Sequence, residues 1–164
     1  MKFRIAHISD FPKIVEIYNE AVSFGGANAD TEPVEVESKR NWFEMHTSPF
    51  FVMVCEIDRK VVAWCSISPY RQGRKALTKT GEISYYVLKE FQGQGIGKKI
   101  IQESINHAKE EGFNNLFAIM LDINTKSKKV LESLDFEIWG HLPDIVEFDN
   151  YTCGQYYMGK KIGI

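Results

Sequence analysis

A glycine-rich turn between an apolar strand and a basic helix is the sequence feature that most restricts the fold of this chain. The segment reads YYVLKEFQGQGIGKK from Tyr85 to Lys99, with glycines at the alternate positions 93, 95 and 97. Glycine adopts backbone dihedrals that are closed to other residues and lets the main chain approach a ligand closely. The free N–H groups of such a turn converge on an anion, assisted by the dipole of the following helix. The turn therefore predicts a pyrophosphate site, to which Lys98 adds positive charge.

Two common phosphate-binding patterns fit this turn poorly. The P-loop needs G-x-x-x-x-G-K-[ST], but residue 92 is glutamine and residue 99 is lysine. The dinucleotide fingerprint G-x-G-x-x-G matches at Gly93 and Gly95, but its third glycine would fall on Lys98. Asp122 follows a later strand about where a ribose-binding acid is expected, so a dinucleotide-dependent enzyme stays an alternative.

Composition is that of an ordinary globular protein and argues against several classes. With 164 residues, 44% of them hydrophobic, and no linker or repeat, we expect a single domain over residues 1–164. The formal net charge of −2 offers no global field for nucleic acid or an anionic membrane. The N-terminus has no apolar run and no segment is long enough to cross a bilayer, so we expect a cytoplasmic protein.

The cysteines and histidines predict neither a disulfide framework nor a metal site. Cys55, Cys65 and Cys153 are widely spaced and odd in number, which suits reduced thiols. The four histidines share no short spacing with one another or with a cysteine, so we expect no zinc.

Apolar periodicity predicts an α/β chain whose strands and helices do not alternate regularly. We expect strands near residues 2–6, 82–88, 116–121, 136–141 and 155–160, and a hairpin of strands 50–57 and 60–68. We expect helices after Ser9 as an N-cap, at about 35–45, from the glycine turn to Gly112, and at 125–134.

The glycine turn resembles the signature of a known family. Gln92-Gly93-Gln94-Gly95-Ile96-Gly97 matches Q/R-x-x-G-x-G/A, the CoA pyrophosphate motif of the GNAT acetyltransferase superfamily. Further segments look like its phosphinothricin acetyltransferase branch: Asp30-Thr31-Glu32-Pro33, Tyr70-Arg71-Gln72-Gly73-Arg74, Glu82 with Tyr86-Val87, and Asn124-Thr125-Lys126-Ser127. The resemblance implies the GNAT fold: a twisted, mostly antiparallel mixed sheet of about seven strands, flanked by helices and opened like a V where CoA enters.

By this resemblance the cosubstrate is acetyl-CoA, and no metal is needed. The amides from Gly93 to Lys98 should hold the CoA phosphates, and Val87 should offer its N–H to the thioester carbonyl as an oxyanion donor. Asn124 and Ser127 should contact the pantetheine arm. The expected cofactor-binding residues are Tyr85, Tyr86, Val87, Gln92, Gly93, Gln94, Gly95, Ile96, Gly97, Lys98, Asn124 and Ser127.

Glu82 is the candidate catalytic base. An attacking amine must be neutral, yet an alkyl amine is protonated at neutral pH, so a base must remove the proton directly or through water. Glu82, Ser84 and Tyr86 point to one face of an extended strand. Burial beside a CoA cleft would raise the carboxyl pKa from about 4.3 and improve the base. Leu131 stands where relatives carry a Tyr or His acid, so the group that protonates the thiolate stays unassigned.

The acceptor pocket is expected to collect Glu32, Tyr70, Arg71, Arg74 and Tyr86. Because arginine binds carboxylates and phosphinates in bidentate fashion, the expected acceptor is an amino acid or an analogue such as phosphinothricin or methionine sulfoximine. Cys153 stands where the branch often has an acid, which argues against phosphinothricin itself.

The expected mechanism is direct attack by the acceptor amine in a ternary complex, in a homodimer by family habit. A covalent route through Cys65 or Cys153 is conceivable, although neither has an evident histidine partner. Leu131 also leaves open a CoA-binding or sensor module without catalysis.

Overall fold

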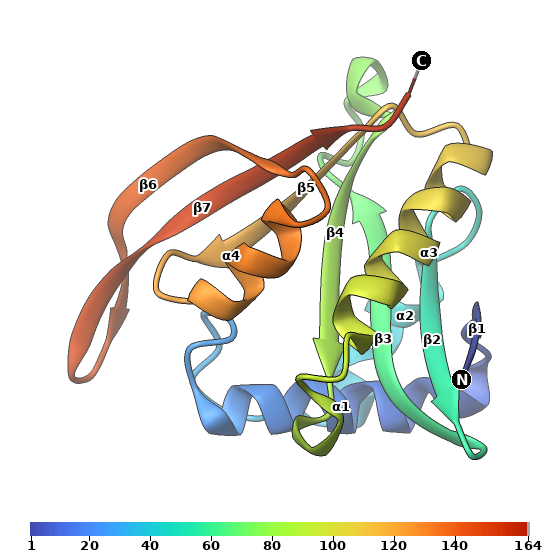
Figure 1. The fold of residues 1–164 in the computed structure, drawn as a ribbon, viewed down its shortest axis with the longest axis horizontal. Coiled ribbons are helices and arrows are strands. Elements are labelled where there is room, and N and C mark those ends of the chain that lie inside the picture. The colour runs from blue at the N-terminus through green and yellow to red at the C-terminus, as the bar shows by residue number, and fades with distance from the viewer. Residues whose placement is uncertain (164) are drawn as a thin grey trace.

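The computed structural model describes residues 1–163 and is built on one seven-stranded sheet in the order β1-β2-β3-β4-β5-β7-β6 (Figure 1). All neighbouring strands are antiparallel except β4 and β5, which are parallel. The predicted mixed sheet is therefore confirmed. Its strands are β1 (Lys2–Ile5), β2 (Phe51–Ile57), β3 (Lys60–Pro69), β4 (Thr80–Val87), β5 (Asn115–Leu121), β6 (Glu137–Phe148) and β7 (Tyr151–Lys161).

Helices cover both faces of the sheet. The indole N–H of Trp64 on β3 donates to the carbonyl of Ile14, 3.0 Å away, so this face lies against the first helix. The next residue, Cys65, points to the opposite face and contacts Ser104 of the third helix. The helices are α1 (Phe11–Phe24), α2 (Arg40–Glu44), α3 (Ile96–Glu110) and α4 (Thr125–Glu132), with 3-10 turns at Ile8–Asp10, Val36–Lys39, Lys75–Leu77 and Lys89–Phe91.

The parallel strands β4 and β5 diverge soon after they meet. They pair only where Thr80, Gly81 and Glu82 face residues 115–117. Beyond this point the two strands separate, and Figure 1 shows β5 swinging away with the β6–β7 hairpin. The sheet therefore opens as the predicted V, with unpaired edges of β4 and β5 on its two sides.

The apolar stripe predicted for the helix after the glycine turn is the face of α3 that packs on the sheet. Ile96, Ile100, Ile101, Ile105 and Ala108 are at most 1% exposed. Full burial of one such isoleucine stabilises the fold by about 1.5–3 kcal/mol. This packing holds the N-terminus of α3, and with it the glycine turn, against the mouth of the V.

The first helix begins differently from the prediction. Ser9 is not the N-cap: it lies in a 3-10 turn capped by the ring of His7, and α1 starts at Phe11. The buried carboxylate of Asp10 accepts the His7 N–H at 2.7 Å and is held by Arg4 at 2.6 Å. The Arg4 guanidinium lowers the pKa of Asp10. An ion pair between β1 and the turn, formed by residues that are six apart in the sequence, therefore fixes the place where the helix begins.

Two further boundaries also differ from expectation. The helix predicted at 35–45 is a 3-10 turn followed by the five residues of α2. The last two strands are longer than predicted, since β6 continues to Phe148 and β7 starts at Tyr151. β6 is an edge strand that pairs only with β7, and most of its residues are exposed on both faces. Such a strand lacks the alternation of apolar and polar residues that identifies strands in a sequence.

Within residues 1–163, none of the helices is long and apolar enough to span a bilayer.

Candidate active site

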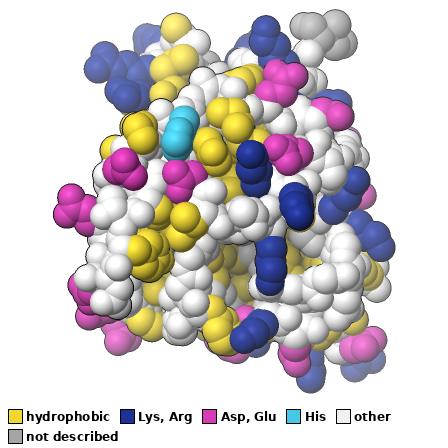
Figure 2. All heavy atoms as spheres, turned by 60° about the vertical axis from the view of Figure 1, so that its left-hand side comes forward, with side chains coloured by type: hydrophobic (Ala, Val, Ile, Leu, Met, Phe, Trp, Pro, Cys, Tyr) yellow, Lys and Arg dark blue, Asp and Glu magenta, His cyan; other side chains and the backbone are white. Residues whose placement is uncertain are grey.

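The opening of the V contains a cleft of about 650 Å³. Figure 2 shows a hollow with apolar side chains inside it and lysine and arginine side chains around it. The walls come from the end of α1 and its following loop, the unpaired part of β4, the glycine turn, β5 and α4. The predicted cofactor residues on these walls are Tyr85, Tyr86, Val87, Gln92, Gly93, Gly95, Ile96, Gly97, Lys98, Asn124 and Ser127.

The glycine turn presents a row of main-chain amides to this cleft. Gly93 and Gly95 have φ angles of 74° and 77°, in the left-handed region that favours glycine, and Gly95 is the N-cap of α3. In the described residues, no amide from Gly93 to Lys98 donates a hydrogen bond to the protein, and the first amide that does is that of Lys99, to Gly95 O at 3.1 Å. Free amides at a helix N-terminus with open space in front of them fit a diphosphate.

Gln94, the remaining predicted cofactor residue, turns away from the cleft wall. Its side-chain amide donates to the carbonyl of Glu90 at 3.1 Å and so braces the turn. Gln92 acts similarly, since its side-chain amide donates to the carbonyl of Val87 at 3.1 Å. The two glutamines thus tie the turn to the end of β4.

The open edge of β4 directs the N–H of Val87 toward the cleft. The next amide, that of Leu88, donates to the carbonyl of Val62 on β3 at 2.9 Å. Main-chain groups of successive residues point to opposite sides of a strand. The N–H of Val87 therefore points away from β3, toward the space between β4 and β5, where a thioester carbonyl could accept it.

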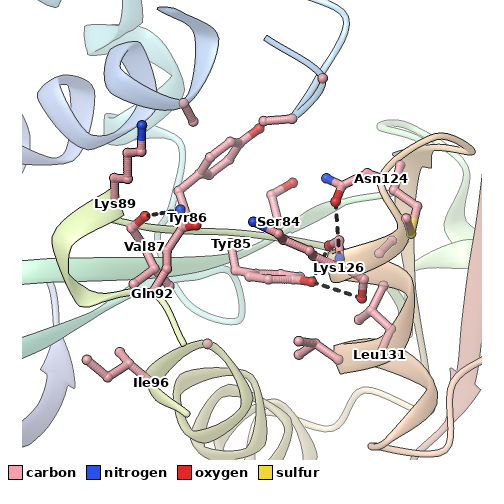
Figure 3. Close-up of a pocket in the computed structure, with 18 of the residues that line it drawn as sticks. Ser84, Tyr85, Tyr86, Val87, Lys89, Gln92, Ile96, Asn124, Lys126 and Leu131 are labelled. Carbon is pink, nitrogen blue, oxygen red and sulfur yellow. Dashed lines mark hydrogen bonds between the residues drawn. The ribbon is translucent and has the colours of Figure 1, made fainter. Parts of the chain in front are cut away.

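Tyr85, Ser127 and Asn124 form a hydrogen-bonded group across the cleft from the glycine turn (Figure 3). The side-chain oxygen of Asn124 caps α4 by accepting the Ser127 N–H at 3.1 Å, so this asparagine serves as an N-cap. The Tyr85 hydroxyl contacts the Ser127 hydroxyl. Burial raises the pKa of Tyr85 to about 12, so its hydroxyl keeps its proton at neutral pH. Leu131 lies on the same wall and is fully buried.

Glu82 lies at the apex of the V, where it is the last residue of β4 paired with β5. It is half-buried, and burial raises the pKa of its carboxyl. It does not itself line the cleft, whereas Ile83 and Ser84, the next two residues of the strand, do. Its carboxylate points to the same face of the sheet as the side chains of Ser84 and Tyr86.

His46 is a neighbour of this carboxylate to which the sequence assigns no role. Ser68 is the cross-strand partner of Glu82, and the Ser68 hydroxyl is 2.9 Å from Nε2 of His46. Nδ1 of His46 is 2.6 Å from the carbonyl of Trp42, which can only accept, so Nδ1 carries the proton. Burial lowers the pKa of His46. A neutral ring then leaves Nε2 as an acceptor, and Ser68 must donate to it.

The residues predicted for the acceptor do not line one cavity. Of the five, only Tyr86 belongs to a cavity wall, and its hydroxyl accepts from the Asn28 side chain at 3.1 Å. Glu32, Arg71 and Arg74 are exposed on loops. Tyr70 packs edge-to-face on Phe117 with 4.6 Å between ring centroids, and the Arg71 guanidinium lies 5.7 Å from the Tyr70 ring.

All three cysteines are buried and unpaired. Burial raises the pKa of Cys65 to about 12, and it also raises that of Cys153. A thiol with such a pKa supplies little thiolate at neutral pH, so the structure disfavours an acetyl-cysteine intermediate. Over residues 1–163, no three His, Cys, Asp or Glu side chains gather as a metal site would require.

Known proteins resemble this chain in both sequence and structure. It is 33% identical over 163 residues, or 99% of each chain, to the "Putative phosphinothricin acetyltransferase YwnH" of Bacillus subtilis. It is 28% identical over 144 residues, 87% of this chain and 83% of the other, to the L-methionine sulfoximine/L-methionine sulfone acetyltransferase of Pseudomonas paraeruginosa. A phosphinothricin acetyltransferase from Sinorhizobium meliloti, solved in complex with acetyl-CoA, superimposes with a TM-score of 0.92 at 25% identity and covers 99% of this chain and 88% of its own.

The family assignment follows from a match of residues 12–136 to the Acetyltransferase (GNAT) family model. This match covers the end of β4, the glycine turn and α4 together, and it overturns the alternative of a dinucleotide-dependent enzyme. The chain belongs to the GNAT family, and it is an acetyltransferase.

Proposed function

We propose that the protein transfers an acetyl group from acetyl-CoA to the primary amine of an amino acid or a close analogue, by direct attack in a ternary complex. The observation that carries this proposal is the cleft itself. On one side of the cleft, the six main-chain amides from Gly93 to Lys98 donate no hydrogen bond to residues 1–163 of the protein. On the other side is the unpaired edge of β4, from which the N–H of Val87 points into the cleft. A diphosphate at one end and a thioester at the other match these two groups of donors.

Recognition of the cosubstrate rests mainly on main-chain atoms. The amides from Gly93 to Lys98 hold the diphosphate, while Lys98 adds a positive charge at the helix start. The free side-chain nitrogen of Asn124 and the Ser127 hydroxyl bind the amide groups of the arm. When bound, acetyl-CoA supplies the thioester carbonyl carbon that the amine attacks.

Glu82 prepares the amine, and Val87 stabilises the charge that develops during attack. Glu82 removes the ammonium proton, directly or through one water, because its carboxylate lies on the face of β4 that Ser84 and Tyr86 share. A raised pKa makes it a stronger base toward an amine than an exposed carboxylate. The Val87 N–H donates to the carbonyl oxygen as it becomes negative. The C–N bond then forms and the C–S bond breaks. CoA departs as a thiolate, and this thiolate takes up the second proton, which the nitrogen loses as it becomes an amide.

The sequence leaves unassigned the acid that assists departure of the thiolate. The hydroxyl of Tyr85, which keeps its proton, is a candidate for this role. It lines the cleft on β4 and is held by Ser127, one turn before Leu131 on α4. A hydrogen bond from it would stabilise the departing sulfur without full proton transfer.

The acceptor class follows from the relatives. Two of them are named for phosphinothricin or methionine sulfoximine, both amino-acid analogues. The exposed guanidinium groups of Arg71 and Arg74 lie beyond the Glu82 end of β4, where they can bind the acceptor carboxylate. We further propose one domain over residues 1–164, a homodimer and a cytoplasmic location.

A thiol-release assay with acetyl-CoA tests the proposal. The panel is L-methionine sulfone, L-methionine sulfoximine, phosphinothricin, proteinogenic amino acids and a polyamine. We expect turnover with α-amino acids, and acetylation at the α-amine by mass spectrometry. Tight acetyl-CoA binding by calorimetry with no turnover on any amine would instead identify a CoA-binding module.

A further inference from the structure

A second cavity, of about 200 Å³, lies on the face of β4 that carries α1 and α2. It adjoins the CoA cleft, because Ser84 and Tyr86 belong to the walls of both. The strand β4 is unpaired on its β5 side at this height, so no strand of the sheet separates the two spaces there. The cavity is lined by Ile14, Val15, Tyr18, Lys39, Trp42, Trp64, Ser66, Ser84 and Tyr86.

Its floor holds a polar atom that has no partner. Ser66 is 1% exposed, and within residues 1–163 its hydroxyl is the one buried side-chain nitrogen or oxygen without a hydrogen bond. Burying an unsatisfied hydroxyl destabilises a fold, so native proteins seldom keep one without a reason. Ser66 is the cross-strand partner of Ser84, so it lies next to a residue that both cavities share.

A lysine and four aromatic rings also line the cavity. The Lys39 ammonium lies 5.3 Å from the centroid of the Tyr18 ring, and no carboxylate within the described residues forms an ion pair with it. Ring centroids are 5.5 Å apart for Trp42 and Trp64 and 4.8 Å apart for Trp64 and Tyr86. The walls are thus largely aromatic, while the Ser66 hydroxyl and the Lys39 ammonium are two groups on them that can donate hydrogen bonds.

We propose that this cavity binds the side chain of the acceptor, and that it selects side chains ending in a hydrogen-bond-accepting oxygen. The terminal oxygen accepts from the Ser66 hydroxyl and the Lys39 ammonium, and the carbon atoms before it contact the rings. A volume of 200 Å³ equals the share of about six or seven water molecules in the liquid, which is the size of an amino-acid side chain. The proposal rests on the proposed function and names the acceptor class of the same site.

The register of β4 makes this placement compatible with transfer. Glu82, Ser84 and Tyr86 point to the same face, so the cavity begins one strand position beyond the base. An acceptor with its side chain beside Ser66 has its α-carbon near Ser84. Its amine then lies between the Glu82 carboxylate and the cleft that holds the thioester.

Tryptophan fluorescence tests binding independently of turnover. Trp42 and Trp64 line the cavity, whereas the third tryptophan, Trp139, is 47% exposed on β6 and can be replaced by phenylalanine. In Trp139→Phe, L-methionine sulfone should change the emission saturably. L-Norleucine, which has a similar length and no terminal oxygen, should bind at least about tenfold more weakly, because the hydrogen bonds from both the Ser66 hydroxyl and the Lys39 ammonium are lost. Equal affinities for the two ligands, or no emission change, would overturn the proposal.

Ser66→Ala and Lys39→Met test selectivity. Each should lower the ratio of kcat/KM for methionine sulfone to that for norleucine, by about fivefold for Ser66→Ala and about tenfold for Lys39→Met, where a charged donor is lost. Ser104→Ala is the matched control, because Ser104 is also fully buried but lies on α3 against the opposite face.

The two proposals fail in different ways. An unchanged ratio in both variants, with turnover retained, would remove the cavity as a subsite and leave the acetyltransferase intact. No turnover with any amine, but saturable binding that Ser66→Ala weakens, would refute the proposed reaction and keep the cavity as a binding site. A higher melting temperature for Ser66→Ala is expected as well, because the unsatisfied hydroxyl is removed.

Discussion

The two cavities beside β4 recognise their ligands in different ways. The CoA cleft is an open space bounded by main-chain amides, glycines and a helix N-terminus. The smaller cavity is bounded by large side chains from α1, α2 and β3, and the Ser66 hydroxyl and the Lys39 ammonium are among its polar groups. Main-chain recognition tolerates many sequences so long as the turn is kept, whereas side-chain recognition changes with each substitution. In the two proposals, main-chain groups of the glycine turn bind the cosubstrate, and side chains from α1, α2 and β3 bind the acceptor.

Glu82→Gln should have the largest effect, because Glu82 is the proposed base and precedes Ser84, which both cavities share, by one position on the same face of β4. We expect kcat to fall about 100-fold, the range for loss of a general base, with KM for acetyl-CoA nearly unchanged. In the parent enzyme, kcat/KM should decrease as the pH falls through the raised pKa of Glu82, and this acid limb should be absent in the variant. Steady-state kinetics across pH measure both. Equal turnover in variant and parent would remove Glu82 as the base.

The same variant should be more stable than the parent at neutral pH. A carboxyl whose pKa is raised in the folded state binds its proton more tightly there than in the unfolded chain. It therefore stabilises the fold below its unfolded pKa, and this contribution is lost as the pH rises through the folded pKa. Glutamine is neutral throughout, so the melting temperature should differ most between parent and variant above that pKa.

Gly95→Val tests whether CoA binding depends on the main-chain amides of the glycine turn or only on the stability of the fold. A β-branched residue at φ 77° strains the turn and moves its amides, so the Kd for CoA should rise at least about tenfold as charge-assisted hydrogen bonds weaken. Gly112→Val is the control: its φ is 87°, it has equally open surroundings, and it lies at the far end of α3. Calorimetry and thermal melts should show similar destabilisation in both variants. Loss of CoA affinity in both would mean that general strain, and not the turn, controls binding.

Ser68→Ala examines the acceptor side near the base. Ser68 is the cross-strand partner of Glu82, and its hydroxyl donates to His46. Burial is what raises the pKa of Glu82, and Ser68→Ala removes a polar group from the surroundings of this carboxyl. The acid limb of the pH profile should therefore move to higher pH. An acid limb that stays in place would show that Ser68 and His46 only support the fold.

Replacing Cys65 and Cys153 together by alanine should have the smallest effect. Both thiols are buried and lie outside both cavities, so kcat should change no more than about twofold. Mass spectrometry after incubation with acetyl-CoA should find no acetyl group on either cysteine of the parent. Acetylation of Cys153 during turnover would contradict direct attack.

Local patterns in the sequence determined the cosubstrate site and most of the fold. Three patterns each act within one element and its neighbour, so they can be read from a window of residues. They are the glycines at 93, 95 and 97, the apolar stripe of α3 and the apolar run of β3. Apart from Gln94, the residues from Gln92 to Lys98 line one cleft together with Asn124 and Ser127, and their contact with CoA stays a prediction.

Tertiary structure alone decided the rest. The start of α1 depends on an ion pair between Arg4 and Asp10, and the surroundings of Glu82 depend on His46, which is far from it in sequence. The second cavity brings Lys39, Ser66 and Tyr86 together from α1–α2, β3 and β4, and the unpaired state of Ser66 exists only once those elements have packed. Such features depend on which contacts form between separate elements and on which polar groups remain without a partner. They therefore cannot be predicted from any single segment of the sequence.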